Sequence, residues 1–241
     1  MIYMEPSSLG WECLLLSWLA TLPPTLASQL QIIEQLFTRF CPALLFFLRR
    51  CNVREIFPGA DSNVIRCLIN LFDCFLDDYY QSKLMEGITE LDCRAQVEGI
   101  FFFSCIWAMG ASLDPEGREK FSILFQALLK KEFPINVQNM FRLPDSLTQP
   151  PKKPYIFLPP SQDTVFDYRF IKEGKGKWKL WSDDLASAPP IPRDIPVNQI
   201  IVTTVETIRN MALMQLLVLH NKHVLFVGPT GTGKSVYVVN F

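Results

Sequence analysis

The sequence has almost no surplus of charge of either sign. Its 241 residues include 23 Lys and Arg against 24 Asp and Glu, which gives a formal net charge of −1. Proteins that hold nucleic acid or anionic membranes through a broad electrostatic field need a marked positive surplus. The composition therefore predicts neither a nucleic-acid partner nor a membrane partner.

Closely spaced cysteine pairs are also absent from the sequence. There is no CxxC pair, and each of the seven cysteines lies in an apolar, helix-like stretch. They are Cys13, Cys41, Cys51, Cys67, Cys74, Cys93 and Cys105. A free cysteine in such surroundings behaves as a small hydrophobic side chain. We therefore expect a reduced intracellular protein with thiols in its core.

No apolar stretch has the features of a membrane or secretion signal. Cys13 to Leu22 is preceded by Glu5 and Glu12 but by no Lys or Arg, whereas a signal peptide begins with basic residues. Ile100 to Ala111 covers only about 12 residues, and roughly 20 are needed to cross a bilayer. The sequence predicts no transmembrane or secretory segment.

Apolar residues at helical spacing dominate the first half of the chain. Steps of three and four residues, which line one face of a helix, separate Leu26, Leu30, Ile33, Phe37 and Phe40. Pro42 ends that run or opens the next one. Further along, Asp61 to Asn63 supply N-cap chemistry for a helix that runs to Tyr80. This part of the chain is predicted to be helical.

The most hydrophobic helix is expected from Leu91 to Ala111. This segment is apolar nearly all round, which indicates a deeply packed position. Asp114 and Pro115 then form a cap and first-turn pair that opens another helix. Residues 1–132 are thus predicted to form one helical unit.

The composition changes after this helical unit. Prolines recur between residues 133 and 163, which predicts an extended connector because proline disrupts helices and central strands. Val165 to Trp181 alternates around a Gly174–Gly176 turn and predicts a hairpin. Thr203 and Glu206 have the capping-box spacing of a further helix.

A short buried strand is expected from Val224 to Val227, directly before a glycine-rich loop. Together with the hairpin and the helix before it, this strand would place residues 164–241 in a second, incomplete unit. The predicted fold class is mainly α with a small β part.

The glycine-rich loop is a complete phosphate-binding motif. Gly228-Pro229-Thr230-Gly231-Thr232-Gly233-Lys234-Ser235 matches the pattern G-x-x-x-x-G-K-[ST]. Its glycines permit backbone conformations that turn successive N–H groups toward a phosphate. Lys234 would reach the β and γ phosphates, and the Ser235 hydroxyl would be a metal ligand for Mg²⁺. The motif predicts ATP and Mg²⁺ as cofactors.

Three other groups of residues carry weaker signals. Lysines at positions 172 to 179, beside Trp178 and Trp181, could form a nucleic-acid surface, but a solvated hairpin tip fits the neutral net charge better. His220 and His223 lack further metal-ligand spacing. Asp77 and Asp78 are more typical of a solvated helix end than of a catalytic pair, so we assign no catalytic residue.

Stretches at both ends of the sequence resemble dynein heavy chains. MIYMEPSSLGW followed by SWL, from Met1 to Leu19, is similar to the passage from an AAA+ core into its helical lid. KWKLW, IIVTTVETIR and VLFVGPTGTGKS are similar to the start of the next AAA+ module. Their order resembles the end of the second module and the start of the third. EGKGKWKLWSDDL is similar to axonemal inner-arm heavy chains.

The resemblance implies a helical AAA+ lid subdomain followed by the truncated start of a P-loop AAA+ α/β domain. It also implies an ATP-binding segment of the minus-end-directed microtubule motor of cilia and flagella. The expected location is the cytoplasm, the cytoskeleton and the axoneme of the cilium. Expected partners are the neighbouring AAA+ modules, dynein intermediate and light chains, and microtubules contacted through other regions of the heavy chain.

Only Val236 to Phe241 follow the motif, without the acidic Mg²⁺ motif, the sensors or the arginine finger of the family. We therefore expect an internal segment of a longer protein that does not hydrolyse ATP by itself. Two alternatives remain open. One is a non-catalytic interaction fragment that binds dynein or other partners, and the other is an unrelated, truncated P-loop ATPase.

Overall fold

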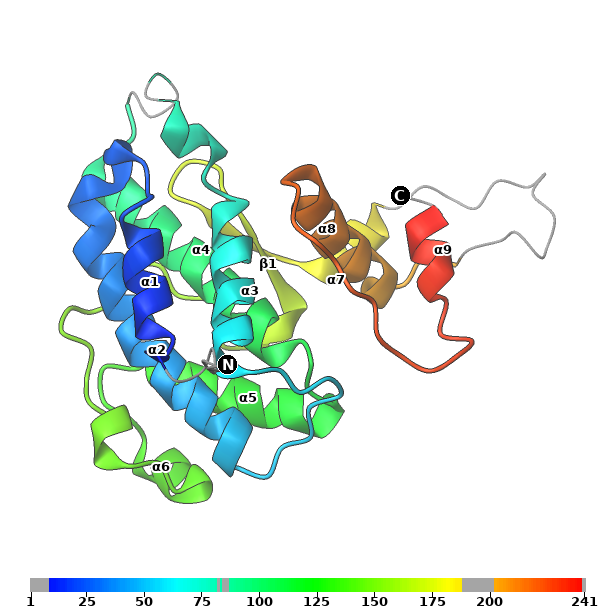
Figure 1. Ribbon diagram of the computed structural model, residues 1–241, viewed down its shortest axis with the longest axis horizontal. Helices are drawn as coiled ribbons and strands as arrows, with labels where there is room; N and C mark the ends of the chain where they lie inside the picture. Colours follow the sequence, from blue (N-terminus) through cyan, green and yellow to red (C-terminus); the bar gives the residue numbers. More distant parts are fainter. Residues whose placement is uncertain (1–8, 82, 84–86, 188–201, 240–241) are drawn as a thin grey trace, which may run out of the picture.

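The computed structural model describes residues 9–81, 83, 87–187 and 202–239. It is mainly helical with one small two-stranded sheet, which confirms the predicted fold class (Figure 1). The start of the dynein-like stretch at residues 1–8 and the prolines between residues 189 and 196 lie outside the described residues.

The elements follow one another along the chain in this order. The α-helices are α1 (Glu12–Leu19), α2 (Leu30–Arg50), α3 (Asp61–Asp73), α4 (Glu90–Gly110), α5 (Pro115–Leu129), α6 (Ile135–Phe141), α7 (Trp181–Ala186), α8 (Val205–Leu219) and α9 (Lys234–Val239). The 3-10 helices are η2 (Pro24–Gln29), η3 (Asp77–Tyr80), η5 (Asp145–Leu147) and η6 (Val165–Asp167). Strands β1 (Tyr168–Ile171) and β2 (Lys177–Leu180) pair antiparallel, with Phe170 opposite Trp178.

Helix α4 lies at the centre of the helical unit, as its apolar sequence predicted. It packs against α2, α3, α5 and β1 (Figure 1). Ile100, Phe101 and Phe102 are completely buried within it. Phe40 of α2 meets the rings of Phe101, Phe102, Phe125 and Tyr155, with centroids 5.3 to 5.9 Å apart. Tilted and edge-to-face ring pairs of this kind add to the stabilisation that comes from burial alone.

Two glycines let the hairpin region approach α4 closely. A Cβ atom at Gly99 would lie 2.3 Å from the ring of Phe170, and one at Gly110 would lie 2.5 Å from the ring of Phe166. Any larger residue would push these rings away. The hairpin therefore packs as part of the helical unit, whereas the sequence division had grouped residues 164–241 with the following unit.

The proline-rich segment is less extended than its sequence suggested. Helix α6 and the 3-10 helix η5 form within residues 133–163. Val137 and Phe141 of α6 are buried, and the Phe141 ring lies edge-on to Phe47 of α2 at 5.3 Å. The prolines limit the length of these helices. Apolar contacts with α2 nevertheless stabilise α6.

Helix α2 continues through Pro42, where the sequence suggested that a helix ends or begins. The whole stretch Pro24–Arg50 is long and apolar enough to cross a membrane, judged by length and composition alone. However, Ile33, Phe37 and Phe40 are completely buried in the protein core. Burial in the core accounts for the apolar character of this stretch. The free energy gained from that burial outweighs the loss of the one helical hydrogen bond that Pro42 removes.

Helix α3 begins and ends differently from the prediction. Its N-cap is Ala60, and no side chain caps it. The Asp61 carboxylate instead accepts a hydrogen bond from Arg49 Nε at 2.8 Å. The helix ends at Asp73, well before Tyr80. Asp77–Tyr80 form the separate 3-10 helix η3.

The caps of α5 and α8 were predicted with different success. Asp114 caps α5 as expected, and its side chain accepts from the Gly117 N–H at 2.8 Å. Helix α8 is capped by Thr204, which accepts from the Thr207 N–H at 3.2 Å. The capping-box spacing had indicated Thr203. Two adjacent threonines offer the same chemistry, so local sequence alone does not choose between them.

Replacing Phe40 tests the central role of the ring cluster. We expect Phe40→Ala to lower the free energy of unfolding by about 3–5 kcal/mol, because a buried ring is lost and a cavity remains. The measurement is urea denaturation followed by circular dichroism. Leu91→Ala is the control, because Leu91 is 67% exposed in α4 and should change stability by less than about 0.5 kcal/mol. Equal effects would contradict this assignment of the core.

Candidate functional site

Helix α8 leads to the phosphate-binding motif and packs against the helical unit. Arg209 near its start is buried, and its Nη1 donates to the Phe166 carbonyl at 3.1 Å. Its guanidinium also lies 5.5 Å from the centre of the Trp107 ring, a cation–π contact. Sequence reasoning did not single out Arg209, because both partners come from distant parts of the chain. Arg209 therefore fixes the start of α8 on the helical unit.

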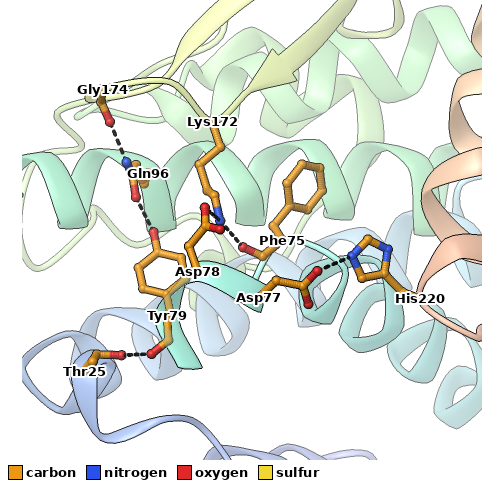
Figure 2. Close-up of polar contacts among 9 residues, drawn as sticks. All are labelled: Thr25, Phe75, Asp77, Asp78, Tyr79, Gln96, Lys172, Gly174 and His220. Carbon is orange, nitrogen blue, oxygen red and sulfur yellow. Dashed lines mark hydrogen bonds and ion pairs between the residues drawn. The ribbon is translucent and has the colours of Figure 1, made fainter. Parts of the chain in front are cut away.

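The end of α8 makes two further contacts with the helical unit. His220 Nε2 lies 3.0 Å from Asp77 Oδ2 (Figure 2). Its Nδ1 donates to the Leu216 carbonyl at 2.6 Å. Lys222 Nζ lies 3.2 Å from Asp73 Oδ2. The chain therefore enters the segment that carries the motif from a position tied to α3 and η3.

Both aspartates of η3 form ion pairs while their side chains remain exposed, at 69% for Asp77 and 48% for Asp78. Asp78 lies 2.9 Å from Lys172 Nζ, which also donates to the Phe75 carbonyl at 2.5 Å (Figure 2). The same lysine lies 4.9 Å from the centre of the Tyr79 ring. Lys172 was expected at a solvated hairpin tip, and it instead joins the hairpin to η3.

A buried hydrogen-bond chain extends this connection into the core. The Tyr79 hydroxyl donates to Gln96 Oε1 at 2.5 Å, and Gln96 Nε2 donates to the Gly174 carbonyl at 2.5 Å (Figure 2). Thr25 Oγ1 donates to the Tyr79 carbonyl at 2.5 Å. Burial raises the pKa of Tyr79, so the phenol stays neutral and remains a donor. This series of hydrogen bonds links η2, η3, α4 and the hairpin turn.

The phosphate-binding motif forms an exposed loop before α9. Gly231 and Gly233 have φ angles of +84° and +75°, in the left-handed region that favours glycine. No atom lies near a Cβ built at either position, so conformation rather than crowding requires glycine there. Gly228 is half-buried, whereas Pro229, Thr230 and Ser235 are exposed. Ser235 is the second residue of α9.

Lys234 folds back over the loop. Its Nζ donates to the Gly228 carbonyl at 2.9 Å, to the Pro229 carbonyl at 2.6 Å and to Thr232 Oγ1 at 3.1 Å. Thr232 Oγ1 in turn donates to the Pro229 carbonyl at 2.8 Å. The structure thus brings the predicted lysine and the loop backbone together, and this places a positive charge beside the loop.

The prediction of a strand from Val224 to Val227, directly before the loop, is wrong. Val224 to Val227 pair with no strand among the described residues, and Leu225 is 73% exposed. Phe226 stacks on Tyr237 of α9, with ring centroids 5.7 Å apart. A strand needs a hydrogen-bonding neighbour, and β1 and β2 are already paired with each other on α4. The apolar, β-branched sequence alone therefore did not produce a strand.

The residues of the loop suit a phosphate ligand. Two left-handed glycines and an ammonium group beside the loop backbone are features that cradle phosphates in such motifs. The exposed Ser235 hydroxyl can act as a Mg²⁺ ligand. In the described part of the chain, no cluster of three or more His, Cys, Asp or Glu forms a separate metal site.

Comparison with known protein families accounts for both parts of the chain. Residues 33–183 match the family described as dynein heavy chain AAA lid domain, and residues 189–241 match the P-loop containing dynein motor region. The chain belongs to the dynein heavy-chain family. An unrelated P-loop ATPase is thereby excluded. The dynein lid match includes the hairpin, in agreement with its packing on α4.

Individual dynein heavy chains are similar over the whole length of this chain. It is 28% identical to dynein axonemal heavy chain 3 of Mus musculus over 100% of its length, and 34% identical to dynein axonemal heavy chain 12 of Rattus norvegicus over 99%. It is 30% identical to dynein axonemal heavy chain 1 of Homo sapiens, again over 99%. The chain spans only 6%, 8% and 6% of the lengths of these relatives.

The contacts between α8 and the dynein lid predict unequal effects for two aspartates. Asp73 accepts from Trp18 Nε1 at 2.8 Å as well as from Lys222, and Trp18 is buried. We expect Asp73→Ala to cost about 1–3 kcal/mol, because the indole N–H loses its partner. Asp77→Ala should cost less than about 1 kcal/mol, because its pair with His220 is exposed.

Urea denaturation of both variants measures this difference. Asp77→Ala is the matched control, because it removes the same charge from the neighbouring turn. An Asp77→Ala variant at least as unstable as Asp73→Ala would contradict the assignment.

Proposed function

We propose that this chain is part of the motor region of an axonemal dynein heavy chain, and that residues 228–235 bind the phosphates of ATP with Mg²⁺. The observation that carries the proposal is the loop itself. Its glycines adopt left-handed conformations and its lysine lies over the loop backbone, within the segment that matches the dynein P-loop region. The names of the similar heavy chains support the axonemal assignment.

Each residue of the loop has a proposed part in nucleotide binding. Lys234 would carry the charge that meets the β and γ phosphates, and Ser235 would hold Mg²⁺, which neutralises phosphate charge when bound. Gly231 and Gly233 allow the loop conformation. The other residues of the loop would complete the backbone cradle, namely Gly228, Pro229, Thr230 and Thr232.

The wider role proposed for this segment is that of the whole heavy chain. We infer that this segment joins the lid of the second AAA+ module to the P-loop of the third, in a minus-end-directed microtubule motor of cilia and flagella. Its partners would be the neighbouring AAA+ modules, dynein intermediate and light chains, and microtubules through other regions. The proposed location is the axoneme, within the cytoskeleton and cytoplasm.

A role as an interaction surface is a second candidate. Large apolar side chains are exposed around the loop, with Leu219, Leu225 and Val239 67%, 73% and 82% exposed. Contiguous exposed apolar groups often mark a surface that another protein segment covers. In the preferred assignment, neighbouring parts of the same heavy chain cover this surface.

The proposed nucleotide site is tested by Lys234→Ala in a dynein heavy chain that contains this sequence. Nucleotide binding at this loop should weaken at least about tenfold, because a charge-assisted contact with the phosphates is lost. Photolabelling with an azido-ATP analogue, followed by identification of the labelled peptide, separates this loop from other sites. Lys175→Ala in the exposed hairpin turn is the control. Unchanged labelling would refute the assignment.

The 241-residue chain by itself is expected to show no measurable Mg-ATP turnover. Hydrolysis needs a group that orients the attacking water as well as a phosphate cradle. In the described part of the chain, no acidic side chain forms an ion pair or hydrogen bond with Lys234 or Ser235. Phosphate release at high protein concentration is the measurement. Turnover that disappears in Lys234→Ala would overturn this expectation.

A further inference from the structure

A cavity of about 200 Å³ lies between α2, α4 and the proline-rich segment, within the helical unit. Helix α2 contributes Arg39, and α4 contributes Arg94 and Glu98. The proline-rich segment closes the cavity with residues 146–155, which include Lys152 and Lys153. None of the loop residues 228–235 lines it, so it is separate from the proposed nucleotide site.

The charge around this cavity is unbalanced. Among the described residues, four cationic side chains line it and Glu98 is the one carboxylate in the lining. Both oxygens of Glu98 are already engaged. Oε1 accepts from Arg94 Nε at 2.9 Å, and Oε2 accepts from the backbone N–H groups of Ile156 and Phe157 at 2.7 and 2.9 Å. Glu98 therefore holds the connector on α4, and it neutralises only Arg94.

Arg39 adds a positive charge to the lining, and its guanidinium interacts with the Tyr155 side chain, which also lines the cavity. Its Nη2 donates to the Leu128 carbonyl at 3.0 Å. Its Nε is buried, and no hydrogen-bond partner for it is found among the described residues. Burial lowers the pKa of Arg39, and its interaction with Tyr155 offsets part of this effect. Contacts with Leu128 and Tyr155 thus hold the guanidinium in place beside the cavity.

The lysines complete the cationic lining at the mouth of the cavity. Lys152 and Lys153 are exposed, and neither forms an ion pair or hydrogen bond among the described contacts. Arg39 is half-buried in α2. An anion in the cavity would therefore meet a fixed guanidinium and two adjustable ammonium groups.

We propose that this cavity binds a small phosphate-type oxyanion. A planar guanidinium and nearby ammonium groups match the charge and geometry of a phosphoryl group. The cavity is smaller than the roughly 300–1,000 Å³ typical of sites for larger ligands, so a single phosphoryl group suits it better than a nucleotide. Free phosphate and a phosphorylated side chain share this chemistry.

The test measures binding of inorganic phosphate to the complete chain by isothermal titration calorimetry at constant ionic strength. All proteins carry Lys234→Ala, so that the proposed nucleotide loop does not contribute. The paired substitution Lys152→Gln and Lys153→Gln should weaken phosphate binding by at least about tenfold. Lys130→Gln with Lys131→Gln is the matched control, because this adjacent exposed pair lies outside the cavity. The control should bind within about twofold of the parent.

Arg39→Gln should abolish saturable binding, and a thermal melt of this variant checks its fold, because Arg39 also donates to Leu128. The lysine pair keeps the test decisive if that variant unfolds. Absence of saturable binding in the parent, or equal loss in the control pair, would overturn the proposal. If the parent binds phosphate, competition by a phosphoserine peptide but not by its unphosphorylated form identifies a phosphorylated segment as the source. Lack of competition identifies free phosphate.

Discussion

The structure depends on a helix that is buried on nearly every side. Helix α4 is apolar nearly all round, so its burial requires neighbours on every face. Helices α2, α3 and α5 supply bulky rings and aliphatic side chains. The hairpin region supplies Phe166 and Phe170 where Gly99 and Gly110 leave space. This single constraint explains why the hairpin packs on the helices of the dynein lid.

The loop that carries the phosphate-binding motif has a different physical character. It is exposed and has few contacts of its own, and its position follows from α8. Arg209 fixes the start of α8 on the lid, and His220 and Lys222 tie its end to η3 and α3. The lid therefore determines the direction from which the chain reaches the motif. The two parts are linked by specific polar contacts as well as by apolar packing.

Local patterns in the sequence were sufficient for the features that depend on nearby residues. The apolar run of α4, the Asp114 cap and the Gly174 turn each involve only nearby positions, and the structure confirms them. The motif at residues 228–235 was also evident. Features that depend on distant partners were not predictable. Arg209 reaches residues 43 and 102 positions away. Val224 to Val227 have no neighbouring strand within the described ranges, although their sequence favours one.

Trp107 has a further consequence for the study of this protein in solution. Its indole lies between the guanidinium of Arg209 and the rings of Phe166 and Trp181, at 5.5, 5.7 and 6.3 Å. A cation above an indole and a dry environment both influence tryptophan emission. Departure of α8 from the lid would remove the cation and admit water. The tryptophan emission of the chain, to which Trp107 contributes as one of five tryptophans, should therefore change when this junction opens.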